Sequence, residues 1–552
     1  MKNLVIVESP SKSKTIEKYL GKEYTVVPSV GHIRDLATSG KGGLGVDVEN
    51  NFEPTYVISK DKKSTVDDLK KKVKSADHVY LATDPDREGE AISWHLADEL
   101  GLDIEDKNRV TFHEITKNAV LDAFEKPRAI DMDLVHSQET RRILDRIIGF
   151  KLSKLINKKI HSKSAGRVQS VALKLIVDRE KEIQAFIPEE YWNIDAIFEK
   201  DNKEFTAQLA KIDGKKAKLT SEEEAKEVYE NCQGLFVVKE IKKTVRKREA
   251  KPAFITSTLQ QEASTKLSFS SKRTMSIAQR LYEGVDVGNG QEGLITYMRT
   301  DSTRLSNQFV YACRERIEEL YGKNYLGYYK VKNDDNAQDA HEAIRPTNLN
   351  YSPESIKGYL KSEEYKLYKL IYERAVASLM AAAKFDALSV TLNQKKYDFS
   401  ATGSTLIFDG YLKVYGDYET NKDTLLPNLQ ESEELSAKEI KPSQHFTEPP
   451  ARYTEARLIK ALEEDGIGRP STYATIIDTI QARSYVTLEP STEKSKTKVF
   501  RPTEQGILTT EKLDEFFSDI INVAYTASME TQLDEIAEGE ATEVKTLRDF
   551  YD

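Results

Sequence analysis

The stretch VYLATDPDREGEAISWHL, residues 79–96, changes from an apolar run into a helical pattern within a few positions. Its first part has the character of a buried strand, and Pro85 lies near the start of the helix that follows. LVIVE, residues 4–8, leads into a helix in the same way, with Pro10 near its first position. Strands that alternate with helices predict a parallel sheet, so we expect an α/β domain at this end of the chain.

Four carboxylates fall within seven positions of that stretch: Asp84, Asp86, Glu88 and Glu90. The helix dipole stabilises acids in a first turn, but this accounts for one or two of them rather than four. Like charges so close together repel and favour a bound cation. Because ligands bind at the carboxyl ends of parallel strands, Asp84 and Glu8 should face one crevice. Oxygen ligands favour a hard cation such as Mg²⁺, held by Asp84, Asp86, Glu88 and Glu8.

The composition is that of an ordinary globular protein with several domains. At 552 residues the chain exceeds what one core can fill, and it is 39% hydrophobic and 31% charged. No run is apolar enough for a signal peptide or a membrane span, which predicts a cytoplasmic protein without a membrane partner. Two distant cysteines, Cys232 and Cys313, provide neither a disulfide framework nor a zinc site.

The charge is unevenly distributed along the chain. There are 82 Lys and Arg against 91 Asp and Glu, a net charge of −9, which by itself argues against binding a polyanion. Residues 141–174, however, contain ten basic residues and a single acid, Asp145. A solvated helix face is one explanation of this run. The scarcity of acids favours the other, an anion-binding surface.

The sequence contains no convincing nucleotide-binding loop. GKGGLG, residues 40–45, matches the letters of a dinucleotide fingerprint, but it follows no strand and opens no helix. No Walker A pattern occurs. Chemistry driven by ATP is therefore not expected.

The remainder of the chain predicts three further structural units. Residues 133–187 have a mostly helical pattern, and alternating runs at about 191–245 and 387–435 indicate strands. Because the two β-rich pieces flank a long insertion, they suggest one discontinuous domain. GLITYM, residues 293–298, is the strand expected within the insertion. After residue 450 two helical patterns meet at a Gly-Ile-Gly turn, as in a winged-helix unit.

Eight motifs follow one another along residues 1 to about 545: VIVESPSKSKTI, SVGHIRDL, ATDPDREGEAISWHL, FHEITKNAV, SAGRVQS, GLITYMRTDSTRLS, AQDAHEAIRPT and GIGRPSTYATII. In this order they closely resemble the bacterial DNA topoisomerase I family, the type IA enzymes. The resemblance implies a multidomain α/β plus α architecture arranged as a toroid. Its parts would be a Toprim domain with a Rossmann-like parallel sheet, helical and winged-helix-like DNA-binding parts, and a discontinuous β-rich hinge.

The resemblance also places the domain boundaries. The Toprim domain is expected at residues 1–35 and 76–132, and the single-strand DNA-binding domain at 36–75, 133–190 and 440–552. The hinge is expected at 191–254 and 378–439, and an inserted domain at 255–377.

Tyr297, in the motif ITYMRTDS, is implied by the resemblance to be the nucleophile that joins covalently to the 5′ phosphate of a cut single strand. A phenol, with an ordinary pKa of about 10, reacts poorly at neutral pH, so a cation has to favour its ionised form. Arg299, two positions on and on the same side of a strand, would do this and hold a phosphate oxygen. A phosphotyrosine ester conserves the energy of the phosphodiester, in keeping with the missing ATP motif.

The family pattern implies roles for further residues. Glu8 resembles the general acid for the departing 3′ oxygen, and Lys12 the lysine that stabilises charge on the phosphate. His341 resembles a histidine of the active-site network. Mg²⁺ would keep the cleaved 3′ end aligned for rejoining. The residues expected to contact DNA are Arg87, Arg167, Gln169, Arg469, Ser471 and Thr472.

The resemblance therefore predicts a monomer, associated with the nucleoid, that relaxes negatively supercoiled DNA at single-stranded or underwound segments. Three alternatives remain open: a decatenating enzyme like topoisomerase III, a Toprim nuclease or primase, and a DNA-binding protein without activity. The chain is expected to be a core that lacks the family's C-terminal zinc-ribbon region, through which a contact with RNA polymerase would be made.

Overall fold

Three parallel strands form the centre of the N-terminal domain in the computed structural model, which describes residues 2–38, 43–160, 166–329 and 341–552. The strand order is β2-β1-β7, and Val5 of β1 pairs with Val26 on one side and Tyr80 on the other. The predicted parallel α/β arrangement is confirmed. Its elements are β1 (Asn3–Val7), α1 (Pro10–Leu20), β2 (Tyr24–Pro28), β7 (His78–Leu81), α3 (Arg87–Glu99) and α4 (Lys117–Phe124).

Helix α2 (Lys63–Lys74) packs on this sheet, which differs from the prediction. Its residues Val66 and Leu69 share one buried cluster with Leu4 of β1. The assignment of 36–75 to the DNA-binding domain is therefore wrong for α2, because the apolar side of this helix faces the parallel sheet. The short strands before α2 are β3 (Arg34–Leu36), β4 (Val46–Asp47), β5 (Glu53–Pro54) and β6 (Tyr56–Ile58).

A helical domain is built around a second buried cluster, which includes Ile156, Leu173, Ile477 and Met529. Two helices meet at the predicted Gly-Ile-Gly turn and are followed by a two-stranded hairpin, as expected for a winged-helix unit. The elements are α5 (Met132–Ile160), α6 (Arg167–Ala185), α14 (Glu455–Glu464), α15 (Tyr473–Ala482), β18 (Val486–Pro490), β19 (Lys498–Pro502), α16 (Glu504–Phe517), α17 (Val523–Ala537) and α18 (Glu543–Tyr551).

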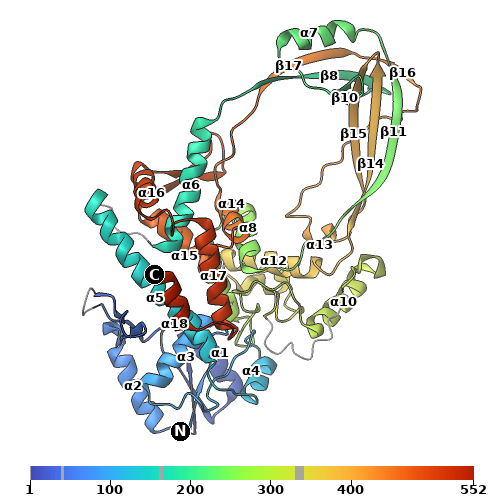
Figure 1. Cartoon of the computed structure of the whole chain (residues 1–552). Helices are drawn as coiled ribbons and strands as arrows, with labels where there is room; N and C mark the ends of the chain where they lie inside the picture. The colour runs from blue at the N-terminus through green and yellow to red at the C-terminus, as the bar shows by residue number, and fades with distance from the viewer. Residues whose placement is uncertain (1, 39–42, 161–165, 330–340) are drawn as a thin grey trace.

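The largest sheet lies at the opposite end of the molecule from the parallel sheet (Figure 1). It is antiparallel, in the order β16-β11-β14-β15-β9-β8-β17, with β10 beside β9. The predicted boundary at residue 439 divides β17, which pairs with β8 along its whole length and so belongs to the sheet. The strands are β8 (Glu190–Lys200), β9 (Lys203–Ile212), β10 (Lys215–Lys216), β11 (Leu235–Arg248), β14 (Ala383–Gln394), β15 (Tyr397–Phe408), β16 (Glu434–Ser436) and β17 (Glu439–Phe446), with α7 (Glu222–Asn231) and α13 (Leu412–Tyr415).

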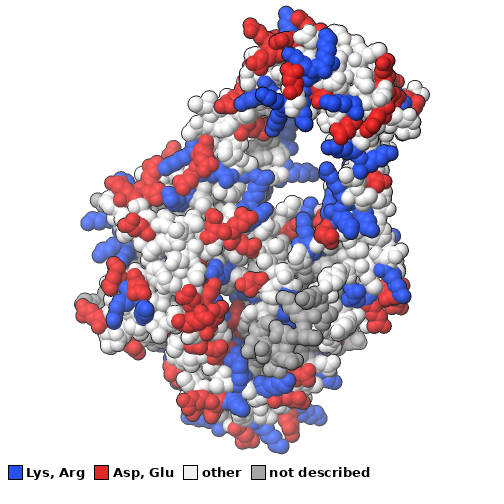
Figure 2. All heavy atoms as spheres, turned by 45° about the vertical axis from the view of Figure 1, so that its right-hand side comes forward, with Lys and Arg blue, Asp and Glu red and all other residues white. Residues whose placement is uncertain are grey.

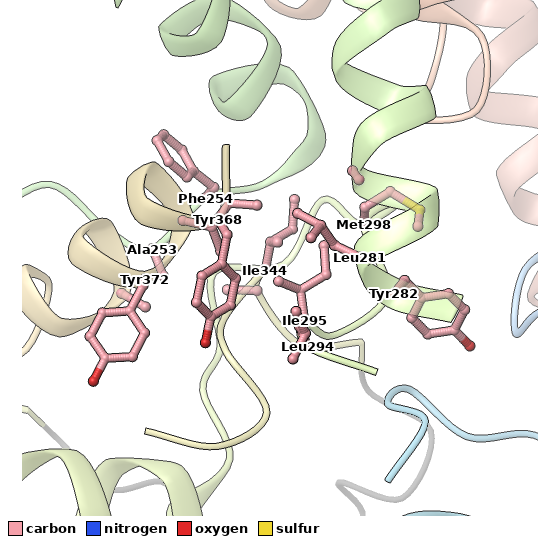
Figure 3. Packing of buried hydrophobic residues seen from close by; sticks show 14 of the residues in the cluster. Ala253, Phe254, Leu281, Tyr282, Leu294, Ile295, Met298, Ile344, Tyr368 and Tyr372 are labelled. Atoms are coloured by element: carbon pink, nitrogen blue, oxygen red, sulfur yellow. The ribbon is translucent and has the colours of Figure 1, made fainter. Parts of the chain in front are cut away.

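The inserted domain packs around Phe254, Leu281, Ile295 and Tyr368 (Figure 3). The strand expected at 293–298 is wrong. Ile295 makes an isolated bridge to Pro346, and neighbouring N–H groups donate to loops instead of to a regular ladder. The elements are α8 (Thr256–Leu267), α9 (Ser271–Glu283), β12 (Val285–Asp286), β13 (Gln291–Glu292), α10 (Asn307–Tyr321), α11 (Pro353–Ile356) and α12 (Ser362–Ala377).

The four parts close into a ring (Figure 1). β8 and β17 leave the large sheet together toward the helical domain, while β11 and β14 leave it together toward the inserted domain. The inserted domain and the N-terminal domain share one buried cluster, to which Phe112 and Tyr297 both belong. Figure 2 shows the resulting opening from another side, bordered by Lys and Arg side chains. The predicted toroid is confirmed.

Glu90, the last acid of the opening stretch, is fully buried and holds the N-terminal domain together. It accepts hydrogen bonds from Arg109 Nε and Arg128 Nη2, both at 2.6 Å. Arg109 Nη1 in turn donates to the carbonyls of Leu81, the last residue of β7, and of Thr83 just beyond it. Burial raises the pKa of Glu90, but the two guanidinium groups lower it below its ordinary value, so the carboxylate is charged.

Glu90→Ala should destabilise this domain by about 3–5 kcal/mol, because it leaves two guanidinium groups without their buried partner. Urea denaturation followed by circular dichroism measures the loss in the transition of this domain. Glu105→Ala, at an exposed position, is the matched control and should change the free energy of unfolding by less than about 0.5 kcal/mol. Equal effects of the two substitutions would contradict a structural role for Glu90.

Candidate active site

A buried lysine joins the ends of the two central strands. Lys12 Nζ lies 2.8 Å from Glu8 Oε1 and 3.0 Å from Asp84 Oδ1. The Asp84 N–H also donates to Glu8 Oε2, at 2.7 Å. Burial by itself would lower the pKa of Lys12, but the charges of Asp84 and Glu8 raise it above its ordinary value. The structure thus brings these three residues together as the sequence predicts, with the lysine as a permanent cation.

Asp86 is the N-cap of helix α3, and Gly89 in its first turn lets the helix start close to the residues that follow β7. The Asp86 side chain accepts the N–H of Gly89 at 2.7 Å, as an N-cap does. A Cβ on Gly89 would lie 1.8 Å from the carbonyl oxygen of Asp84, so a side chain there would push the helix away. Burial, and next the charge of Glu8, raise the pKa of Asp84 to about 6.

The four acids expected to bind a metal line one pocket of about 440 Å³: Glu8, Asp84, Asp86 and Glu88. Within the described ranges, no three His, Cys, Asp or Glu side chains are arranged to hold a metal ion as they stand. The acids have protein partners instead, and Glu88 Oε2 lies 2.9 Å from His32 Nε2. Carboxylate oxygens around one pocket suit a hard cation. Such an ion would have to draw them away from these partners.

Tyr297 reaches this acidic pocket from the inserted domain. Its hydroxyl donates to Asp86 Oδ2 at 2.5 Å, and its backbone N–H donates to the carbonyl of His113 at 2.7 Å. The side chain is buried, with the ring edge-on to Tyr282 at 5.1 Å between centroids. Burial raises the pKa of Tyr297 well above its ordinary value, and so do Asp86 and Asp84, while Arg299 lowers it. At rest the phenol therefore keeps its proton.

Arg299 lies beside the contact between Tyr297 and Asp86, and His341 packs on His113, whose carbonyl accepts the Tyr297 N–H. Arg299 Nη1 is 3.7 Å from Asp86 Oδ2, the oxygen that accepts from Tyr297. The ring of His341 is edge-on to that of His113, with 5.3 Å between centroids. Both Arg299 and His341 line a second pocket, of about 660 Å³, which shares Asp86, Glu88 and Arg299 with the acidic pocket.

Three of the six residues expected to contact DNA line this second pocket: Arg87, Arg469 and Ser471. Thr472 precedes α15, and its hydroxyl accepts the N–H of Arg469 at 2.9 Å. Arg87 and Arg469 are both paired with Asp534 of α17, at 2.5 and 2.8 Å. Three of the expected contacts are therefore gathered at one place, but the two cations among them are already paired with an acid.

Arg167 is engaged within the protein in this structure, whereas the DNA contact expected of Gln169 stays a prediction. Arg167 is 1% exposed and pairs with Asp145 at 3.0 Å and with Glu530 at 3.4 Å. The side chain of Gln169 lies against Gly166, where an added Cβ would come within 2.4 Å of its Oε1. Arg167 holds the helical domain together here because acids from other elements enclose its guanidinium group.

The basic run at 141–174 is more neutralised than its local composition suggests. Arg141 makes a two-pronged ion pair with Glu530, at 2.8 and 2.6 Å, and Lys174 pairs with Asp514 at 2.9 Å. The acids come from helices that lie far along the chain. The predicted anion-binding surface therefore has fewer free cations than its sequence suggests, although Lys151, Lys154 and Lys158 remain exposed on α5.

Sequence reasoning missed Tyr282, Glu114 and Asp534. Glu114 Oε1 binds Arg345 Nη2 at 3.0 Å and so links the N-terminal and inserted domains. Both of these residues lie inside quoted motifs, FHEITKNAV and AQDAHEAIRPT, which was a usable signal. Tyr282 and Asp534 lie outside all eight motifs, and only the folded chain brings them to the site.

Two families match the chain by sequence. A family described as DNA topoisomerase matches residues 129–548, and one described as Toprim domain matches residues 3–115. A crystal structure of full-length topoisomerase I from Thermotoga maritima is 41% identical in sequence and superposes with a TM-score of 0.88. The match covers 99% of this chain and 89% of that one.

Asp84 predicts a pH dependence of stability in metal-free buffer. Its pKa of about 6 in the folded chain exceeds the value of about 3.9 expected when unfolded. Between these values the folded state keeps a proton that the unfolded state has lost, so this group lowers the free energy of unfolding as the pH rises from about 4 to about 6. Asp84→Asn, which does not titrate, should have a flatter profile of melting temperature over this range. Parallel profiles of the two proteins would contradict the raised pKa.

Proposed function

The chain belongs to the bacterial type IA DNA topoisomerases, and from this membership we propose that it relaxes negatively supercoiled DNA by cutting and rejoining one strand through Tyr297. It is a DNA topoisomerase, which is an isomerase, and DNA is its substrate.

One observation carries the proposal: the phenolic oxygen of Tyr297 is hydrogen-bonded to Asp86, which lines both the acidic pocket and the arginine-lined pocket. Its hydrogen bond to Asp86 Oδ2 puts it beside the acids, and Asp86 and Arg299 line both pockets. A strand held by arginines in the second pocket would have one phosphate close to this oxygen. The sugar that carries the departing 3′ oxygen, on the 5′ side of this phosphate, would lie toward Glu8.

In the proposed cleavage, the Tyr297 oxygen attacks phosphorus, a phosphotyrosyl bond forms at the 5′ phosphate, and the bond from phosphorus to the 3′ oxygen breaks. The phenolic proton leaves along the hydrogen bond to Asp86, and the 3′ oxygen takes a proton from Glu8. Arg299 and Lys12 supply positive charge beside the phosphate. Rejoining reverses each step. One ester replaces another, so no ATP is needed.

Strand passage requires the inserted and N-terminal domains to separate while the broken ends stay bound. Polar contacts hold them closed: Ser9 Oγ donates to Glu283 Oε2 at 2.7 Å, and Arg345 binds Glu114 at 3.0 Å. The buried cluster that the two domains share also resists opening. We propose that the large sheet bends to let them part, since β11 and β14 join it to the inserted domain, and β8 and β17 join it to the helical domain that follows the N-terminal one.

Toprim domains in general bind Mg²⁺, and Asp84, Asp86, Glu88 and Glu8 would hold it in this chain. When bound, the ion supplies positive charge at the phosphate and at the cleaved 3′ end.

We propose that a single chain is the working unit and that it acts on the chromosome. One chain closes the ring and supplies Glu8, Lys12, Asp86, Tyr297 and Arg299 to one place. No helix in the described part of the chain is long and apolar enough to span a membrane.

Tyr297→Phe removes one oxygen and should lower covalent adduct formation with a single-stranded oligonucleotide to below about one thousandth of wild type. Binding of the same oligonucleotide should remain within about twofold, because the arginines are untouched. Denaturing electrophoresis followed by mass spectrometry of the adduct measures the first quantity. Tyr282→Phe makes the same change on the adjoining buried ring and should retain the adduct. If Tyr297→Phe still cut DNA and left a free 5′ end, the chain would be acting as a nuclease.

Asp84→Ala combined with Asp86→Ala should lower Mg²⁺-dependent relaxation about a hundredfold or more, with a much smaller effect on oligonucleotide binding. Relaxation of a supercoiled plasmid over a Mg²⁺ titration is the measurement. Asp98→Ala, on the same helix but outside the acidic pocket, is the control and should behave as wild type. A double variant that relaxes normally at limiting Mg²⁺ would remove the proposed metal site.

A further inference from the structure

A carboxylate on α17 occupies two arginines of the second pocket at once. Asp534 Oδ1 lies 2.5 Å from Arg87 Nη2, and Asp534 Oδ2 lies 2.8 Å from Arg469 Nη2. The three residues come from α3, from the turn before α15 and from α17. A cation from the N-terminal domain and one from the helical domain are thus bridged by a single acid.

Asp534 accepts hydrogen bonds from the same two donors of Arg469, Nε and Nη2, that would bind a phosphate. Nε of Arg469 also points to Asp534 Oδ2, at 3.2 Å, so the Nε and Nη2 donors both serve this carboxylate. Nη1 donates to the carbonyl of Gly468 at 2.7 Å and is committed to the backbone. A carboxylate and a phosphate both present pairs of oxygens to a guanidinium group. A phosphate can therefore bind Arg469 in this way only where Asp534 now lies.

Glu530 lies one helical turn before Asp534 on α17 and differs from it in burial, as expected of an acid whose role is only structural. Its side chain is 0% exposed and is enclosed by Arg141 and Arg167. The side chain of Asp534 is 34% exposed and lines the second pocket, and those of Arg87 and Arg469 are 28% and 23% exposed. Ion pairs as open as these are weak and screened by salt, so a polyanion can displace them.

Asp534 is charged when DNA is absent. Burial raises its pKa, but hydrogen bonds from Arg469 and Arg87 lower it below its ordinary value. The free pocket therefore carries a fixed negative charge at the place where two cations converge.

We propose that Asp534 is a positioning residue that stands in for a backbone phosphate: it holds Arg87 and Arg469 on one point in the DNA-free enzyme and yields them to the incoming strand. The inference rests on the proposed binding of a single strand in this pocket. Asp534 then lowers the affinity for the strand, because its two ion pairs must break whenever a strand binds. It also speeds release of the strand, because it pairs with the two arginines again as the strand leaves.

The test is equilibrium binding of a fluorescent single-stranded oligonucleotide at several salt concentrations, in a Tyr297→Phe background so that no adduct forms. Asp534→Asn keeps the shape and removes the charge. It should bind on the order of fivefold more tightly, with the slope of log affinity against log salt steeper by about 0.7, the value for one further phosphate. Unchanged or weaker binding, or an unchanged slope, would overturn the inference.

Glu538→Gln is the matched control, because Glu538 lines the same pocket and is not paired with Arg87 or Arg469 in the described contacts. It should change affinity by less than about twofold. An increase equal to that of Asp534→Asn would reduce the effect to general charge and overturn the inference.

Arg87→Gln keeps the test decisive if Asp534→Asn has a lowered melting temperature. It removes one partner and leaves the pair between Arg469 and Asp534 in place. Binding should weaken about threefold or more and the salt slope should fall by about 0.7, because one phosphate contact is lost. Unchanged affinity and slope would show that the cluster serves structure alone.

Adduct formation by the wild-type enzyme on the same oligonucleotide distinguishes failure of the proposed function from failure of this inference. Absence of the adduct would contradict the proposed function. Adduct formation together with unaltered binding by Asp534→Asn would contradict this inference only.

Discussion

The contact between Tyr297 and Asp86 joins two domains that are connected through the chain only by way of the large sheet. A single hydrogen bond contributes about 1 kcal/mol and cannot close a ring of this size. The closed state depends on what surrounds it, above all the apolar cluster shared by Phe112, Tyr282 and Tyr297. The same burial keeps water from the phenol and raises its pKa. Closing the ring and restraining the nucleophile are thus consequences of one packed interface.

In the free protein each acid of the site has a partner, and a bound DNA phosphate would add negative charge that has no partner yet. Each acid near the strand ends has a partner: Lys12 serves Glu8 and Asp84, and His32 serves Glu88. A phosphate brought to Tyr297 would add negative charge to this group. The excess has to be met by Arg299, by a divalent cation or by both, which explains why acids and cations alternate around a single tyrosine.

Much of the fold could be predicted because short stretches of the sequence indicate its strands and helices. Apolar runs followed by helices indicated the parallel sheet, and the paired β-rich segments indicated a discontinuous domain. The failures concern non-local choices. The apolar face of α2 could have packed on either domain, and Tyr297 has the neighbours of a strand but hydrogen-bonds to loops. The acids that neutralise Arg141 and Lys174 lie on helices far along the sequence, where no local count of charge could find them.

The paired strands at either side of the ring have a mechanical consequence. β11 and β14 pair from Val237 opposite Asn393 to Arg248 opposite Ala383, with one shift of register between Val238 and Glu240, so a pull along this ribbon is shared by many backbone hydrogen bonds in shear. Bending the ribbon across its width breaks few of them. Torsional stress in a DNA molecule bound to the protein would therefore bend the ribbons sideways rather than separate their strands. The two broken DNA ends could then move apart while the protein stays folded.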